Sequence, residues 1–98
     1  MLNNKNAILC AKVIKKNGTS QQMLKAGEEC TELAQAIFRM AQDGSNWHHT
    51  DNLIEEMVDV IVMTEQLVLI TGLTREKINE MARQKLERAL GEVVANGR

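Results

Sequence analysis

Proline is absent from this 98-residue chain, and the only large aromatic residues are Phe38 and Trp47. Without proline, the sequence has no residue that breaks a helix by removing a backbone donor. The six glycines stand mostly between periodic segments. Good helix formers, among them Ala, Leu, Glu, Lys, Gln and Met, are common instead. The composition is that of an all-α protein, and the length predicts one domain over residues 1–98.

Long hydrophobic runs are also missing. The strongest, Val60 to Met63 and Leu67 to Ile70, are far too short to cross a bilayer, so no membrane partner is expected. No signal-peptide pattern precedes the first helix, which predicts a cytoplasmic protein. Cys10 and Cys30 have neither metal-site spacing nor a secreted context, and we expect both to be buried free thiols.

Net charge is nearly absent as well, at −1, which excludes the global basic field typical of nucleic-acid-binding proteins. The charges are nevertheless unevenly distributed. Six of the thirteen acidic residues lie in two short blocks, residues 28–32 and 55–59. Many lysines and arginines lie elsewhere, so an anionic ligand could bridge the two populations through a metal.

Hydrophobic periodicity predicts four helices. They cover about residues 5–16, 19 or 20 to 42, 50 or 51 to 71, and 75–94. Asn17-Gly18 should end the first helix, and Gly72 should follow the third. Thr19 with Gln22 fits a capping box, and Thr74 fits an N-cap. The last helix carries an apolar stripe that is expected to face the core. The stripe consists of Ile78, Ala82, Leu86, Ala89 and Val93.

The two acidic blocks lie on core-facing stripes of the second and third helices. Residues three apart share a helix face, so Glu29 projects with Glu32, and Glu56 with Asp59. Acidic side chains are almost never buried unless they are paired. Four carboxylates gathered between two helices would repel one another unless a cation lay among them. The pattern therefore favours a hard divalent metal held by oxygen ligands.

The short loop between these helices predicts antiparallel packing, with Glu32 opposite Glu56 and Glu29 opposite Asp59. The positions of the acids along the two helix axes do not match at first sight. At 1.5 Å per residue, Glu32 lies about 15 Å from a helix end at residue 42, and Glu56 about 8 Å from a start at residue 51. The levels match better if the second helix frays by Met40 and the third begins near Thr50.

Two segments of the chain, residues 25–34 and 55–60, together resemble the MazG family of all-α nucleoside triphosphate pyrophosphohydrolases. The family pattern is Glu-Glu-x-x-Glu, an intervening stretch, then Glu-x-x-Asp. Here it is matched by five residues, Glu28, Glu29, Glu32, Glu56 and Asp59. The resemblance covers the second and third helices closely and is weaker on the fourth. Two half-motifs in this order form a fairly specific signal.

The resemblance implies a four-helix MazG-like bundle completed by oligomerisation, as a dimer or a tetramer. It implies hydrolysis of an NTP or dNTP to the monophosphate and pyrophosphate, with Mg²⁺ as cofactor and Mn²⁺ as the alternative. Carried over residue by residue, the metal ligands are Glu29, Glu32, Glu56 and Asp59. Glu28 and Glu29 are the catalytic candidates. Glu28 points about 100° away from Glu29 around the helix, so it could support a ligand, help to activate water, or simply be solvated.

Substrate contacts are assigned to three basic residues and one aromatic residue, each with an alternative. Lys25 could contact phosphate or pair with Glu29 one turn later. Lys85 and Arg88 could offset triphosphate charge or form ordinary solvated surface. Trp47, expected in the loop, could stack on a base or pack against its own domain or a partner subunit.

Three functions therefore remain in view. The first is the pyrophosphohydrolase, in which the cut falls between the α- and β-phosphates. No phosphate-cradling glycine loop is present, so a kinase- or ATPase-like cut at the γ-phosphate is not expected. The second is a non-catalytic helical interaction module whose acids bind a structural cation or a basic partner. The third is a pyrophosphohydrolase acting on a phosphoribosyl-nucleotide.

Overall fold

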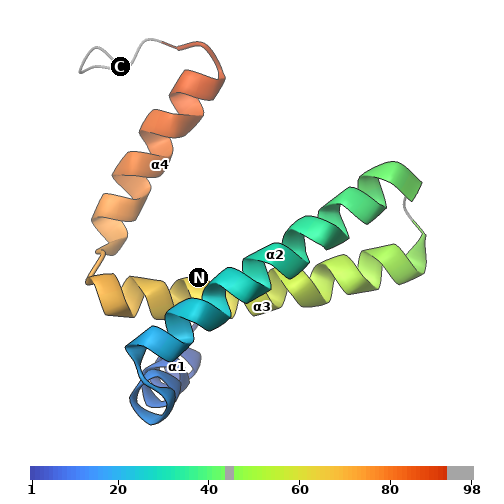
Figure 1. The fold of residues 1–98 in the computed structure, drawn as a ribbon. Coiled ribbons are helices and arrows are strands. Elements are labelled where there is room, and N and C mark those ends of the chain that lie inside the picture. Colours follow the sequence, from blue (N-terminus) through green and yellow to red (C-terminus); the bar gives the residue numbers. More distant parts are fainter. Residues whose placement is uncertain (44–45, 93–98) are drawn as a thin grey trace.

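The structure is a computed structural model that describes residues 1–43 and 46–92. These residues form four helices and no strand, which confirms the all-helical prediction. The helices are α1 (Asn4–Asn17), α2 (Thr19–Asp43), α3 (Trp47–Thr71) and α4 (Arg75–Ala89) (Figure 1). Helix α4 ends at Ala89, earlier than the predicted residue 94, and Gly91 follows it with a positive φ of 78°. Val93 of the predicted apolar stripe lies outside the described residues.

Three of the predicted helix boundaries are confirmed. Gly18 ends α1 with a φ of 92°, and its N–H donates to the carbonyl of Ile14 at 2.8 Å. Gly72 ends α3 in the left-handed conformation with a φ of 71°. Both positions require the positive φ that glycine adopts without steric cost. The Thr74 hydroxyl accepts a hydrogen bond from the backbone N–H of Lys77 and so begins α4.

The start of α3 differs from the prediction of residue 50 or 51. The helix begins at Trp47, because the side chain of Asn46 accepts a hydrogen bond from the backbone N–H of His49 at 3.0 Å. Asn is among the strongest N-cap residues. In the sequence, Asn46 belongs to the segment Asp43-Gly44-Ser45-Asn46, whose residue types are typical of a turn after the second helix. Trp47 therefore belongs to the first turn of α3, and its predicted place in a loop is wrong.

The proposed capping box at the start of α2 is not formed either. Gln22 is buried, and its side chain donates to Gln66 on α3 at 2.7 Å rather than reaching back to Thr19. Its side-chain oxygen accepts a hydrogen bond from Asn17. The contact between helices takes precedence over the local cap.

The core lies between α2 and α3, which run antiparallel as predicted (Figure 1). Their facing stripes contain small or flexible buried residues, among them Ala26, Ala36 and Met63. Helix α1 packs against both, and its buried Cys10 lies against α3, where its thiol approaches the carbonyl of Val62. The other cysteine, Cys30, is exposed, so the prediction that both are buried is wrong for this residue.

Helix α4 stands apart from the other three (Figure 1). It leaves α3 at an angle of 117°, and within the described part of the chain it packs against none of α1, α2 and α3. None of its residues is buried, so its predicted core stripe faces no core in the single chain. On this helix Arg83 forms ion pairs with Glu80 at 2.7 Å and Glu87 at 2.8 Å.

Hydropathy along the helices agrees with the short apolar runs of the sequence. Among the described helices, none by itself is long and apolar enough to cross a membrane. Only the bent pair of α3 and α4 meets such a criterion, by length and composition alone.

The close packing of α2 on α3 predicts a sharp size limit at Ala36, which is 1% exposed. We expect Ala36→Leu to lower the free energy of unfolding by about 1–3 kcal/mol, because a larger side chain forces the helices apart. Ala41→Leu, at an exposed position of the same helix, is the control and should change it by less than about 0.5 kcal/mol. Urea unfolding followed by circular dichroism measures both. Equal effects would contradict the packing described.

Candidate metal centre

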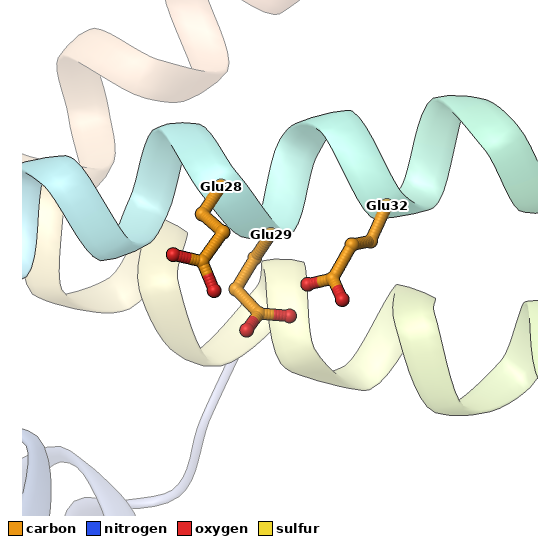
Figure 2. A group of neighbouring side chains, drawn as sticks. All are labelled: Glu28, Glu29 and Glu32. Atoms are coloured by element: carbon orange, nitrogen blue, oxygen red, sulfur yellow. The ribbon is translucent and has the colours of Figure 1, made fainter.

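Two overlapping groups of carboxylates lie at the contact between α2 and α3. In the first, Glu28, Glu29 and Glu32 each place one oxygen within 4.8 Å of the others. Figure 2 shows these three side chains extending from α2 on the side of α3. In the second, Glu29, Glu56 and Asp59 approach one another within the same distance across the two helices. Glu29 belongs to both groups and is the centre of the cluster.

The levels of the two helices match for a reason other than the one expected. Helix α2 does not fray at Met40 but continues to Asp43, and α3 begins earlier than predicted, at Trp47. At 1.5 Å per residue, Glu32 then lies about 16 Å from the end of α2, and Glu56 about 13 Å from the start of α3. The N-cap at Asn46 thus adds the turn of helix that brings the acids level.

Burial within the cluster is uneven. Glu29 is only 8% exposed, and Glu56 is half-buried. One carboxylate oxygen of Glu56, Oε2, is buried and has no hydrogen-bond partner among the described residues. Glu28, Glu32 and Asp59 are exposed. A buried carboxylate oxygen without a partner is costly, and either a hydrogen-bond donor or a cation would satisfy it.

Lys25 compensates part of this negative charge. Its ammonium lies 3.1 Å from Glu29 Oε1 and 3.8 Å from Glu28 Oε1. The hydrogen bond with Glu29, followed by the charges of Glu29 and Glu28, raises the pKa of Lys25. Of its two sequence-based interpretations, the ion pair is therefore present in the structure. One lysine does not balance five neighbouring acids.

The uncompensated charge raises two carboxyl pKa values above their ordinary value of 4.5. For Glu32, the largest cause of the raised pKa is the charge of Glu29, followed by burial and the charge of Glu56. For Glu56, burial raises the pKa most, followed by the charges of Asp59 and Glu29, while Arg39 opposes the rise. Glu32 and Glu56 therefore bind protons more readily than isolated carboxylates do.

The donor set fits a hard divalent cation. All donors are carboxylate oxygens, which Mg²⁺ prefers, and no His or Cys belongs to either group. The oxygens of the cross-helix group lie within 4.8 Å of one another, close enough for one cation to contact all three side chains after small rotations. Glu29, Glu56 and Asp59 would hold such an ion, with Glu32 beside them.

The remaining predicted site residues are not gathered at the cluster within one chain. Lys85 and Arg88 lie on α4, which packs against none of α1–α3 in the described part of the chain. Trp47 is 68% exposed at the start of α3, and its ring stacks on His48 with centroids 3.4 Å apart. Nine residues separate Trp47 from Glu56, which is about 13 Å along the helix.

Sequence reasoning missed a second polar feature beside the acids. Gln22 and Gln66, 6% and 2% exposed, are hydrogen-bonded to each other in the contact between α2 and α3. The sequence does contain a signal for this pair. Gln22 lies seven residues before Glu29, and Gln66 lies seven residues after Asp59, so each is two helical turns from an acid on the same face. The helix faces that carry the acids therefore also carry these two amide side chains.

Comparison of the chain with protein-family models, with curated proteins and with solved structures gives no match. Its functional interpretation therefore rests on the residues and geometry described above.

The raised carboxyl pKa values predict an unusual pH dependence of stability without metal. Glu32 and Glu56 bind protons more tightly in the folded than in the unfolded chain, so the stability they contribute is present at low pH and is lost as pH rises through the folded pKa values. In EDTA, we expect the midpoint of urea unfolding to rise as pH falls from neutral toward the ordinary carboxyl pKa of 4.5. The double variant Glu32→Gln/Glu56→Gln should flatten this rise.

Mg²⁺ should act in the opposite direction, because it favours ionised carboxylates. At about pH 7.5, saturating Mg²⁺ should raise the unfolding midpoint of the wild type, and Asp59→Asn should reduce that gain. In EDTA, Asp59→Asn should be at least as stable as the wild type, because it removes a repelling charge. A wild type whose midpoint is insensitive to both pH and Mg²⁺ would contradict the metal centre.

Proposed function

We propose that this protein is a MazG-like nucleoside triphosphate pyrophosphohydrolase that depends on Mg²⁺. The observation that supports the proposal best is the cross-helix group of Glu29, Glu56 and Asp59, with its unpartnered Glu56 oxygen. The same residues are the ones that match the family pattern. The residues of the sequence motif thus lie together in the spatial cluster.

The chemistry divides among the residues of the site. Mg²⁺, held by the cross-helix group, would supply charge neutralisation for the triphosphate and its pyrophosphate leaving group. Glu28 is exposed beside Glu29 and is the carboxylate available to orient water and accept its proton. Lys25, half-exposed at the edge of the cluster, can turn its ammonium from Glu29 toward a phosphate oxygen.

Reaction type is tested by the products. With Mg²⁺ and a panel of NTPs and dNTPs, the wild type should release monophosphate and pyrophosphate in equal amounts, without orthophosphate as a primary product. In ¹⁸O-water the label should enter the monophosphate or the pyrophosphate. Glu29→Gln should lower turnover at least about 100-fold, because even residues that only support a metal ligand cost up to that factor.

Glu76→Gln, at an exposed acid on α4, is the matched control and should keep full turnover. Circular dichroism should show the same helix content in both variants. Orthophosphate and diphosphate appearing together from the wild type would overturn the assignment. An inert wild type that still gains stability from Mg²⁺ would favour the interaction module. Preference for a phosphoribosyl-nucleotide would favour the third alternative.

The proposal includes a homo-oligomer, and the amount of exposed surface supports it. The chain exposes 7385 Å², whereas a folded monomer of 11.0 kDa exposes about 5,600 Å². Its radius of gyration is 16.3 Å, whereas a compact domain of this length has about 12.6 Å. The excess area, roughly 1,800 Å², is what one subunit hides in a large homodimer interface.

Apolar side chains are exposed on the side of α3 that faces away from α2. Ile54, Met57 and Val58 are 52%, 45% and 51% exposed, and their spacing places them on one helix face. Ile78 and Leu86 of the apolar stripe of α4 are exposed as well. A second copy would cover these surfaces and would allow Lys85, Arg88 or Trp47 of one copy to approach the carboxylate cluster of another.

Light scattering should therefore give a mass of two or four times 11.0 kDa at micromolar concentration. Ile54→Glu places a charge on the exposed apolar face and should shift the protein toward monomer. Gln21→Glu introduces the same side chain at an exposed polar position and should leave the mass unchanged. A wild type that stays monomeric at this concentration would contradict the oligomer.

A further inference from the structure

A cleft of about 350 Å³ opens directly beside the carboxylate cluster. Glu29 and Asp59 form one end of its lining, so the cleft and the candidate metal centre are continuous. Its volume is at the lower end of the range for small-molecule sites, about 300–1,000 Å³. The lining joins the end of α1 to the facing parts of α2 and α3. A ligand with a part bound among the acids would therefore have room for a second part here.

A chain of three side-chain amides lines this cleft. Asn17 Nδ2 donates to Gln22 Oε1 at 3.0 Å, and Gln22 Nε2 donates to Gln66 Oε1 at 2.7 Å. Gln22 and Gln66 are more than nine-tenths buried, while Asn17 is exposed at the rim. Each amide offers two N–H donors and two acceptor lone pairs, and these two hydrogen bonds use only part of that capacity.

The buried amides are hard to explain by packing alone. Two aliphatic side chains of similar size would fill the same space without the desolvation cost of two amides. Val13, Val62 and Met63 form the apolar part of the lining, and Lys25 belongs to its charged part together with Glu29 and Asp59. The amides therefore lie between apolar and charged side chains, and convergent polar groups beside apolar ones are the usual arrangement of a site that fixes the orientation of a small ligand.

We infer that this cleft binds the nucleobase of the triphosphate, with Asn17 and Gln22 contacting the polar edge of the base. The inference rests on the proposed function, which puts the triphosphate on the adjoining carboxylates. Amide side chains suit this task because each presents a donor beside an acceptor, which matches the edge of a base. Gln66 is a positioning residue that holds the Gln22 amide in place.

The cleft lining in the described residues includes no aromatic side chain, so the base is recognised by its edge more than by stacking. Every base has a face that can stack, but bases differ in the donors and acceptors along their edges. Edge recognition therefore predicts clear discrimination among the four bases. A site built to hydrogen-bond a substrate group rejects analogues that lack the group far better than an apolar site does.

The experiment measures kcat/KM of the wild type, Gln22→Met and Asn17→Leu for the four common dNTPs. Gln22→Met should reduce the ratio between the best and the worst base at least about tenfold, the factor expected for one lost hydrogen bond of about 1.4 kcal/mol. The fall in kcat/KM should come mainly from a higher KM for the dNTP that carries the preferred base. Asn17→Leu should act in the same direction, and since Asn17 is exposed, this variant keeps the test open if Gln22→Met unfolds.

Inorganic tripolyphosphate, which carries no base, provides a second measurement. Its inhibition constant should be the same for wild type, Gln22→Met and Asn17→Leu, because the carboxylate cluster is unchanged. Gln21→Met, at the exposed neighbouring position on α2, is the matched control and should leave all values unchanged.

A wild type that does not discriminate among the bases would overturn the inference. A loss in Gln22→Met that is equal for all four bases and for tripolyphosphate would overturn it too, because a merely structural role gives that result; the proposed function would then stand. No turnover by the wild type with any triphosphate would instead overturn the proposed function, and this inference with it.

Discussion

The close contact between α2 and α3 is the constraint on which the rest of the structure depends. Small residues at the contact, Ala26 and Ala36, let the two helices approach closely. Glu29 lies between these alanines on the same helix face, so its side chain is buried and only partly solvated. The charge of the site thus follows from the packing of the core. The favourable burial of apolar surface along both helices offsets the repulsion among the acids.

The same contact explains why acids and amides share one stripe. On α2, Gln22, Ala26 and Glu29 follow one another at helical spacing, and on α3 Gln66 lies two turns beyond Asp59. Polar groups that face a helix partner must find partners there or leave their hydrogen-bonding capacity unmet. The amides meet part of theirs through each other, and Glu29 through Lys25. Glu56 Oε2 has none among the described residues.

Helical periodicity predicted the four helices and placed Glu29, Glu56 and Asp59 on core-facing stripes, because the 3.6-residue repeat fixes which residues share a face. The short loop between the helices predicted the antiparallel packing that brings these stripes together. The start of α3 was missed because Asn46 fits a turn and an N-cap equally well, and only the hydrogen bond to His49 decides between them. The position of α4 was missed for another reason. The apolar stripe of α4 shows which face of the helix is suited to packing. It does not show whether the packing surface belongs to the same chain or to another.

The local ion pairs of α4 have a consequence for the energetics of docking. Arg83 forms ion pairs with Glu80 and Glu87 on the exposed surface of the helix, so contacts within α4 contribute to its helical order. A segment that folds only on binding loses roughly 1–2 kcal/mol of backbone entropy per residue at that moment. Ion pairs at this spacing stabilise an isolated helix by only about 0.2–0.5 kcal/mol each, so they offset a small part of that entropy loss. A partner that orders α4 as it docks would therefore retain less of the apolar contact energy as affinity than a partner that meets an already rigid helix.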